Sequence, residues 1–107
     1  MMHARVTTLS LKKGKGAEAV EIYKNSILPA AKAQKGFRGS IVLADWETDK
    51  GLTLTFWESE KDALASEENC YYQEQLVKVF SLFASPPIRE GFDVAVGAPR
   101  TPRVLKK

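Results

Sequence analysis

The sequence predicts an α+β fold, with one four-stranded antiparallel sheet and helices packed on one of its faces. Two observations lead to this class. Four segments are rich in β-branched and aromatic residues, and two segments between them carry apolar residues at helical spacing. Their order is β-α-β-β-α-β, the ferredoxin-like arrangement. At 107 residues the chain is long enough for one domain with a single core.

The first strand is expected over residues 3–13, where β-branched residues are frequent and glycines follow. A helical pattern begins at Ala17. Its apolar residues recur at helical spacing: Val20, Tyr23, Ile27 and Ala31. Pro29 lies within this helix, where its missing N–H predicts a kink or a break. Gly36 is the expected end of the segment.

Two further strands, 37–47 and 51–58, are expected to form a hairpin around Thr48-Asp49-Lys50. Strand alternation divides their side chains between two faces. One face would carry Phe37, Ile41, Leu43, Leu52, Leu54 and Phe56. The other would carry Arg38, Ser40, Val42, Ala44, Trp46, Thr53, Thr55 and Trp57. Because both faces are partly apolar, we expect a homodimer in which a second protomer covers the sheet face that the helices leave open.

The second helix is expected to begin at Ser59, since Asp62 follows three residues later as in a capping box. A second start at Ser66 predicts a break there. The later part carries an expected core stripe: Tyr72, Leu76, Val79, Phe80 and Phe83. Two prolines then end the helix, and residues 88–96 form the last expected strand.

Charge and composition exclude several classes of function. The net charge is +3, but the segment 97–107 holds Arg100, Arg103, Lys106, Lys107 and no acid. The expected domain, residues 1–96, is therefore close to neutral and has no basic face interleaved with aromatics, so nucleic acid is not predicted as a partner. No apolar run approaches the roughly 20 residues of a membrane span.

The amino-terminal segment alternates and carries charge, unlike a signal peptide. The single cysteine, Cys70, excludes an internal disulfide and fits a reducing compartment, so a cytoplasmic location is expected. The sequence has no glycine-rich phosphate loop, metal-ligand cluster or serine-histidine-acid spacing, and therefore gives no support to nucleotide, metal or hydrolase chemistry.

Three phrases resemble the antibiotic biosynthesis monooxygenase family of dimeric α+β barrel proteins: "KKGK", "ILPAAKAQKGFRGS" and "LTFWESEKDALAS". The resemblance spans about residues 4–96. It implies a cofactor-independent oxygenase that oxidises an anthrone-like phenol to a quinone, with dioxygen as the only co-substrate. Heme-degrading members carry asparagine, tryptophan and histidine at positions that match Thr7, Ser66 and Leu76 here. None is the required residue, so the resemblance does not imply heme degradation, and His3 lies on the wrong element to substitute.

The expected catalytic residues are Trp57, Tyr72 and Thr7. Trp57 could wall the pocket or donate its indole N–H, although it could instead be a structural plug. The phenol of Tyr72 could donate to a substrate oxygen, and Thr7 is expected to face the cavity between sheet and helices. The expected substrate-binding residues are Arg5, Arg38, Thr53, Thr55, Tyr71 and Phe83.

Other reactive groups have simpler explanations. Glu58 and Asp62 are better explained as helix-capping acids than as bases. Cys70 is expected to be a small buried filler, and His3 an exposed residue without a catalytic role.

Two alternatives to the oxygenase stay open. A cofactor-free isomerase or lyase acting on a small carbonyl metabolite would have a smaller, more polar pocket. A non-catalytic binding barrel would have its cavity plugged by Trp46, Trp57 and Tyr72.

Overall fold

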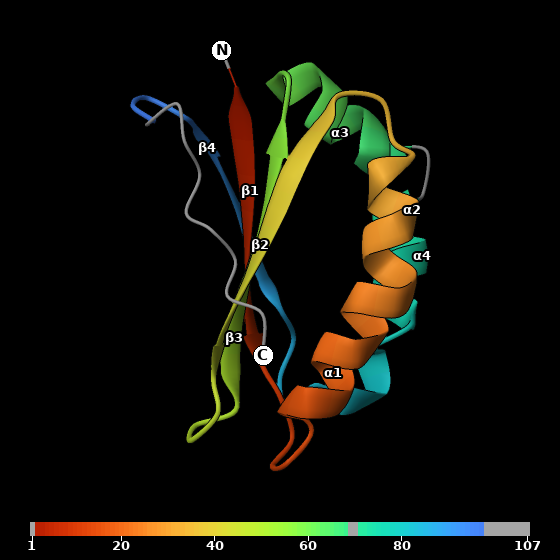
Figure 1. Cartoon of the computed structure of the whole chain (residues 1–107), viewed down its shortest axis with the longest axis vertical. Helices are drawn as coiled ribbons and strands as arrows, with labels where there is room; N and C mark the ends of the chain where they lie inside the picture. The colour runs from red at the N-terminus through yellow and green to blue at the C-terminus, as the bar shows by residue number, and fades with distance from the viewer. Residues whose placement is uncertain (1, 69–70, 98–107) are drawn as a thin grey trace.

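Four antiparallel strands form the sheet of the computed structural model, which describes residues 2–68 and 71–97 and, of Tyr71 and Tyr72, the backbone alone. The strands are β1 (His3–Ser10), β2 (Phe37–Asp45), β3 (Lys50–Trp57) and β4 (Ile88–Asp93), in the order β2-β3-β1-β4 (Figure 1). This is the ferredoxin-like fold that the order of elements predicts. The basic tail from residue 98 onwards lies outside the described residues, so the domain boundary at 96/97 stays a prediction.

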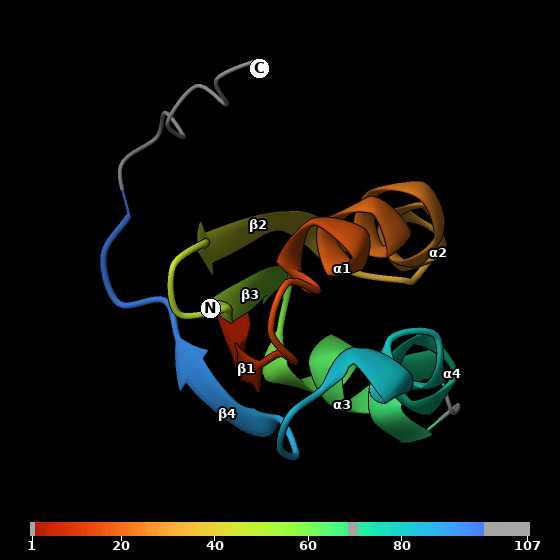
Figure 2. The same cartoon turned by 90° about the horizontal axis from the view of Figure 1, so that it is seen from below.

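The helices all lie on one face of the sheet and leave the other face open (Figure 2). The first helical segment comprises α1 (Gly16–Ile22), a π-helical turn (Tyr23–Ile27) and α2 (Leu28–Lys32). The second comprises α3 (Glu60–Glu68), α4 (Tyr71–Val77) and a 3₁₀ turn (Phe80–Leu82). None of the described helices is long and apolar enough to cross a membrane.

Pro29 lies in the first turn of α2, directly after the π-helical turn. A proline cannot donate to the carbonyl four residues before it, which here belongs to Asn25. A widened turn accommodates that missing hydrogen bond without ending the helix. The predicted disruption therefore takes the form of a π-helical turn rather than a break.

A β-bulge at the start of β2 changes the predicted pairing of side chains. The register shifts between Phe37 and Gly39, so Phe37 lies opposite Trp57 instead of joining Ile41 and Leu43. The rings of Phe37 and Trp57 meet edge to face, with centroids 5.6 Å apart. The predicted face of Phe37 was wrong, because one extra residue in a strand reverses the alternation on one side of it.

The hairpin loop begins earlier than predicted. β2 ends at Asp45, whose carboxylate accepts hydrogen bonds from the backbone N–H groups of Glu47 and Thr48. These bonds lower the pKa of Asp45. Trp46 consequently lies in the loop and is 61% exposed, so its assignment to a strand face was also wrong.

The second helical segment corrects two further expectations. The Ser59 hydroxyl accepts from the N–H of Asp62, as the capping pattern predicts. However, α3 continues through Ser66, and the interruption follows Glu68. Phe80 is exposed, because the chain leaves the α-helix after Val77 and the helical spacing no longer applies. The last strand, β4, ends at Asp93, three residues before its predicted limit.

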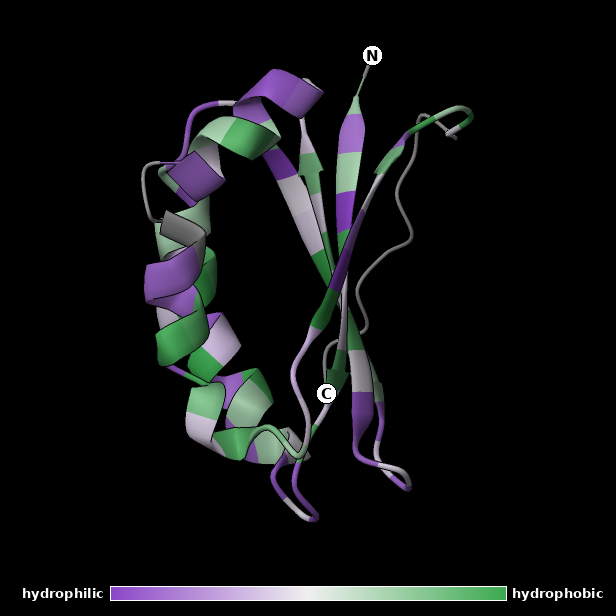
Figure 3. Ribbon diagram, turned by 180° about the vertical axis from the view of Figure 1, so that it is seen from behind, coloured by the Kyte–Doolittle hydropathy of each residue, from purple (hydrophilic) through white to green (hydrophobic). Residues whose placement is uncertain are grey.

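The open face of the sheet is apolar, as the hairpin pattern predicts for the residues assigned to this face other than Phe37. Register pairs Ile41 with Leu54 and Leu43 with Leu52 on this face. Hydrophobic residues recur along the strands (Figure 3). Four large side chains of this face are exposed in the single chain: Ile41, Leu43, Ile88 and Phe92. A face of this kind normally has a partner in solution.

Replacement of Gly36 by alanine is expected to lower the free energy of unfolding by about 1–3 kcal/mol. Gly36 has φ +82°, and an added Cβ would lie 2.6 Å from the Cβ of Asp62. Urea denaturation of Gly36→Ala checks this. Gly14→Ala is the matched control, because Gly14 has φ +78° but nothing within 4 Å of its added Cβ. Equal losses of stability in Gly36→Ala and Gly14→Ala would contradict the conclusion that the contact with Asp62 contributes to the loss.

Candidate active site

A cavity lies between the helix-facing side of the sheet and the helices, with about 660 Å³ of space free of atoms including its mouth. We call it the central cavity. Its walls are largely apolar: Leu9, Ile27, Leu76, Val79 and Phe83. Its polar groups come from three strands, β1, β3 and β4, and from the helices α3 and α4: Thr7, Thr53, Thr55, Ser66, Gln75 and Arg89. An apolar site with a few placed polar groups is the usual form of a small-molecule site.

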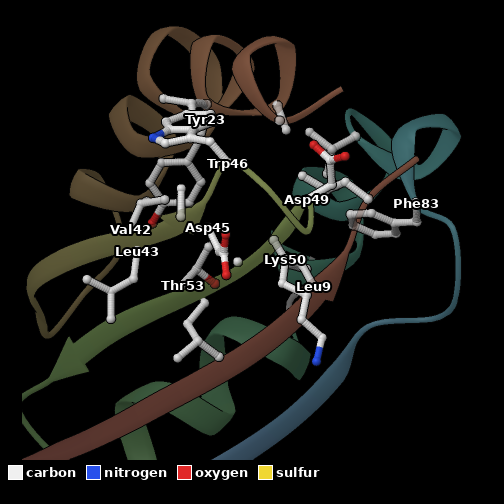
Figure 4. Close-up of a pocket in the computed structure, with 18 of the residues that line it drawn as sticks. Leu9, Tyr23, Val42, Leu43, Asp45, Trp46, Asp49, Lys50, Thr53 and Phe83 are labelled. Carbon is white, nitrogen blue, oxygen red and sulfur yellow. The ribbon is translucent and has the colours of Figure 1, made fainter. Parts of the chain in front are cut away.

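A second cavity adjoins the hairpin loop, with about 550 Å³ of space free of atoms when the open solvent at its mouth is included, and we call it the hairpin cavity (Figure 4). Leu9, Tyr23, Thr53 and Phe83 are among the residues that line both cavities. The two hollows therefore adjoin and extend from the hairpin loop to α3 and α4.

Trp57 forms a wall of the central cavity at the end of β3 and is 2% exposed. Its indole N–H donates to the hydroxyl oxygen of Thr55 over 3.0 Å. The indole is therefore held in place within the protein, while the hydroxyl hydrogen of Thr55 remains available for donation. This arrangement favours Trp57 as a positioned wall and Thr55 as the polar group that it orients.

The other threonines of the cavity share a face of the sheet. Thr7 of β1 lies directly opposite Thr53 of β3, and Thr55 is two residues further along. Side chains two residues apart point to the same face, and all three threonines line the central cavity. The expectation that Thr7, Thr53 and Thr55 contribute to one pocket therefore agrees with their positions.

Two arginines share one carboxylate beside the cavity. Glu67 Oε2 of α3 lies 3.0 Å from Arg5 Nη2 and 2.6 Å from Arg89 Nη1. The side chains are 14% (Arg5), 17% (Arg89) and 29% (Glu67) exposed, so the three charges are largely removed from water. These three side chains sum to one positive charge. Arg89 reaches the cavity wall, and the group can favour a negatively charged oxygen there.

The remaining predicted site residues differ in their positions relative to the central cavity. Arg5 pairs with Glu67 and is not among the lining residues of the central cavity. Arg38 is exposed beside the bulge, forms an ion pair with Glu58 and is not among the lining residues of the central cavity, so its expected role at the substrate stays a prediction. Phe83 does line the cavity. Tyr71 and Tyr72 begin α4, but their side chains, like Cys70, lie outside the described residues.

His3 was wrongly expected to be exposed. It is buried, and its Nδ1 lies 3.2 Å from Asp93 Oδ1 of the neighbouring strand. Gly91 makes room for it, since a Cβ there would lie 2.8 Å from His3 Nε2. β1 lies between β3 and β4 in the sheet, and this central position buries its first residue.

Sequence reasoning missed Gln75, Arg89 and Tyr23 as cavity residues. Tyr23 was assigned to the apolar stripe of the first helix, yet it lines the cavity, and its hydroxyl forms a hydrogen bond with Ser40 of β2. Burial raises the pKa of Tyr23, although the bond to Ser40 partly opposes this. Only the register of the strands and the packing of both helical segments bring these residues to one place, so no local sequence signal marks them.

The raised pKa of Tyr23 predicts a loss of stability in alkaline solution. Above the unfolded value of about 10, the unfolded chain loses this proton while the folded chain keeps it. The free energy of unfolding should therefore fall as pH rises from that value through the folded pKa. The free energy of unfolding of Tyr23→Phe should fall less steeply over this pH range, as measured by urea denaturation at successive pH values. Identical slopes of stability against pH in the wild type and in Tyr23→Phe would contradict the prediction. Ser40→Ala removes the hydrogen bond that lowers the pKa of Tyr23, so it should raise that pKa further.

The fold and the cavity define a class: α+β ferredoxin-like proteins with a largely apolar site between sheet and helices. Solved structures with this fold include SnoaB, a cofactor-independent oxygenase from Streptomyces nogalater, in a variant form. It has a TM-score of 0.76 and 12% identity, and the match covers 92% of this chain and 98% of that one.

A monooxygenase from Streptomyces coelicolor, in complex with nanaomycin D, matches with a TM-score of 0.74 and 14% identity over 92% of each chain. A candidate antibiotic biosynthesis monooxygenase from Nitrosomonas europaea matches at 0.73 and 17% identity, over 88% of this chain and 90% of that one. No protein-family model and no curated protein matches the sequence. The chain therefore has the fold of the antibiotic biosynthesis monooxygenase structures, as the sequence resemblance predicts.

Proposed function

We propose that the protein is a cofactor-independent monooxygenase that oxidises an electron-rich aromatic, such as an anthrone-like phenol, with dioxygen. One observation carries the proposal: the central cavity combines aromatic walls, Trp57 and Phe83, with hydroxyl groups and the Arg89 guanidinium. The likeness in fold to SnoaB and to the Streptomyces coelicolor monooxygenase supports the same reaction class.

The proposed reaction uses the substrate as its own electron donor. A phenolic anthrone loses a proton and becomes an electron-rich anion, which transfers an electron to dioxygen. The ring CH₂ then becomes a carbonyl: one oxygen atom enters the product, and the other leaves with the two hydrogens as water. The positive charge of Arg89 and the hydroxyls of Thr7 and Thr53 would favour the anion, because preorganised donors stabilise developing negative charge.

The form of the cavity favours this function over the two alternatives. An isomerase for a small carbonyl metabolite would need a smaller, more polar site, whereas the walls of the central cavity are mainly apolar. A binding barrel would need Trp46 as part of a plug, but Trp46 is largely exposed in the hairpin loop.

A homodimer formed through the open sheet face is part of the proposal. Exposed Ile41 and Leu43 form an apolar area with Leu52 and Leu54 that a second copy could cover. Leu43→Glu is expected to shift the protein from dimer to monomer in sedimentation velocity. Leu64→Glu, at an exposed apolar residue of α3, is the control and should stay dimeric. A monomeric wild type would overturn this part of the proposal.

The test of the activity is oxygen uptake by chelator-treated protein with a panel of anthrones, naphthols and hydroquinones. For the anthrones and naphthols we expect one dioxygen consumed per quinone formed, with isotopically labelled oxygen in the product. Hydroquinones become quinones by loss of two hydrogens and should carry no label. Thr53→Val should reduce the rate, because it removes a donor of the cavity while keeping the shape of the side chain. Arg38→Gln, outside the cavity, is the control. Rates equal to the spontaneous oxidation for every compound would overturn the proposal.

A further inference from the structure

Gln75 of α4 is 8% exposed and lines the central cavity. Its Oε1 has no hydrogen-bond partner within the described structure. An unpaired buried amide oxygen costs about 1–3 kcal/mol of desolvation. A buried acceptor of this kind at the wall of a cavity can accept a hydrogen bond from a group that enters the cavity.

Ser66 of α3 presents a second acceptor to the same cavity. Its hydroxyl donates to the carbonyl of Ala63 over 2.7 Å, so its proton is already used. The oxygen of Ser66, which also lines the cavity, can therefore only accept from a ligand. Ser66 and Gln75 together favour a ligand that carries a hydroxyl group.

Arg89, in contrast to Gln75 and Ser66, requires a hydrogen-bond acceptor on the ligand. Its Nη1 is held 2.6 Å from Glu67 Oε2, and Glu67 follows Ser66 directly on α3. Arg89 is thus tied to α3, the helix that carries Ser66, and both residues line the central cavity. A guanidinium donates only and favours a negatively charged oxygen.

We propose that Gln75, Ser66 and Arg89 form a specificity site that recognises two oxygens on one edge of an aromatic ligand. One oxygen is an un-ionised hydroxyl that donates to Gln75 or Ser66, and the other is a phenolate oxygen beside Arg89. The inference rests on the proposed function for the orientation of a substrate, but the recognition itself requires no turnover.

The test uses hystazarin, an anthraquinone with two adjacent hydroxyl groups away from its carbonyls, and its monomethyl ether. Both are already quinones, so binding is measured without oxidation. Quenching of tryptophan fluorescence reports affinity, measured in a Trp46→Phe background so that the signal comes from Trp57. Visible absorbance reports whether the bound phenol is ionised. We expect hystazarin to bind about five- to tenfold more tightly than the ether, since the ether lacks one hydrogen-bond donor.

Three variants assign the preference to residues. Gln75→Met should reduce the ratio of the two affinities to about two or less, whereas Gln73→Met, at an exposed position of the same helix, should keep it. Arg89→Lys should keep ionisation of the bound phenol, and Arg89→Met should suppress it. Circular dichroism establishes that each variant is folded.

Equal binding of the two ligands to the wild type would overturn the inference, as would an unchanged ratio in folded Gln75→Met. If a variant fails to fold, the wild-type ratio and the ionisation of bound hystazarin decide the question. A preserved preference without oxygen uptake from any anthrone would overturn the proposed function and leave the specificity site supported. Oxygen uptake from an anthrone without a preference for hystazarin would support the proposed function and overturn the specificity site.

Discussion

Replacement of Trp57 by alanine is expected to lower the free energy of unfolding by about 3–5 kcal/mol. The indole is 2% exposed, packs edge to face against Phe37 and donates to Thr55. Its removal would leave a space next to an existing cavity and release the Thr55 hydroxyl. Because small domains have a total stability of about 5–15 kcal/mol, this loss is a large part of the whole. Urea denaturation measures it.

Two variants separate the causes of that loss. Trp46→Ala removes the other tryptophan, which is largely exposed, and should cost less than about 1 kcal/mol. Trp57→Phe keeps a ring but loses the N–H donor, so it should retain most of the stability while oxygen uptake falls. If Trp57→Ala were no more harmful than Trp46→Ala, the packing assigned to Trp57 would be wrong. Unchanged uptake in Trp57→Phe would show that Thr55 does not need the indole to orient it.

Replacement of Glu67 by glutamine is expected to lower the free energy of unfolding by about 2–4 kcal/mol, below the largest values for fully buried pairs because the side chains retain some contact with water. The change keeps the size of the side chain but leaves Arg5 and Arg89 close together without their shared carboxylate. Desolvated like charges repel, and water screens them only in part. Chemical denaturation at constant ionic strength measures the effect.

Glu18→Gln is the matched control for Glu67→Gln. Glu18 pairs with Lys15 at 3.5 Å, and both side chains are about half exposed. Exposed pairs contribute about 0–1 kcal/mol, so this variant should be close to the wild type. The double variant Glu67→Gln, Arg5→Met should recover part of the loss, because one guanidinium then remains. A loss in Glu67→Gln no greater than in Glu18→Gln would contradict the role assigned to the shared carboxylate.

The positions of the catalytic candidates depend partly on local sequence and partly on register. Strand alternation placed Thr53, Thr55 and Trp57 on one face, and the structure puts all three at the central cavity. Alternation cannot foresee a bulge, so Phe37 was assigned to the wrong face. A bulge follows from how two strands pair rather than from either strand alone.

The sequence by itself determined the order of the elements, the capping by Ser59, the turn at Gly36 and the apolar hairpin face. Each depends on interactions between residues a few positions apart, and such interactions leave a periodic or local pattern. Only the tertiary structure decided that Glu67 lies between Arg5 and Arg89, that His3 is buried beside Asp93, and that Gln75 lines the cavity. These arrangements join strands and helices far apart in the chain. They arise from sheet register and helix packing, which nearest neighbours in sequence do not encode.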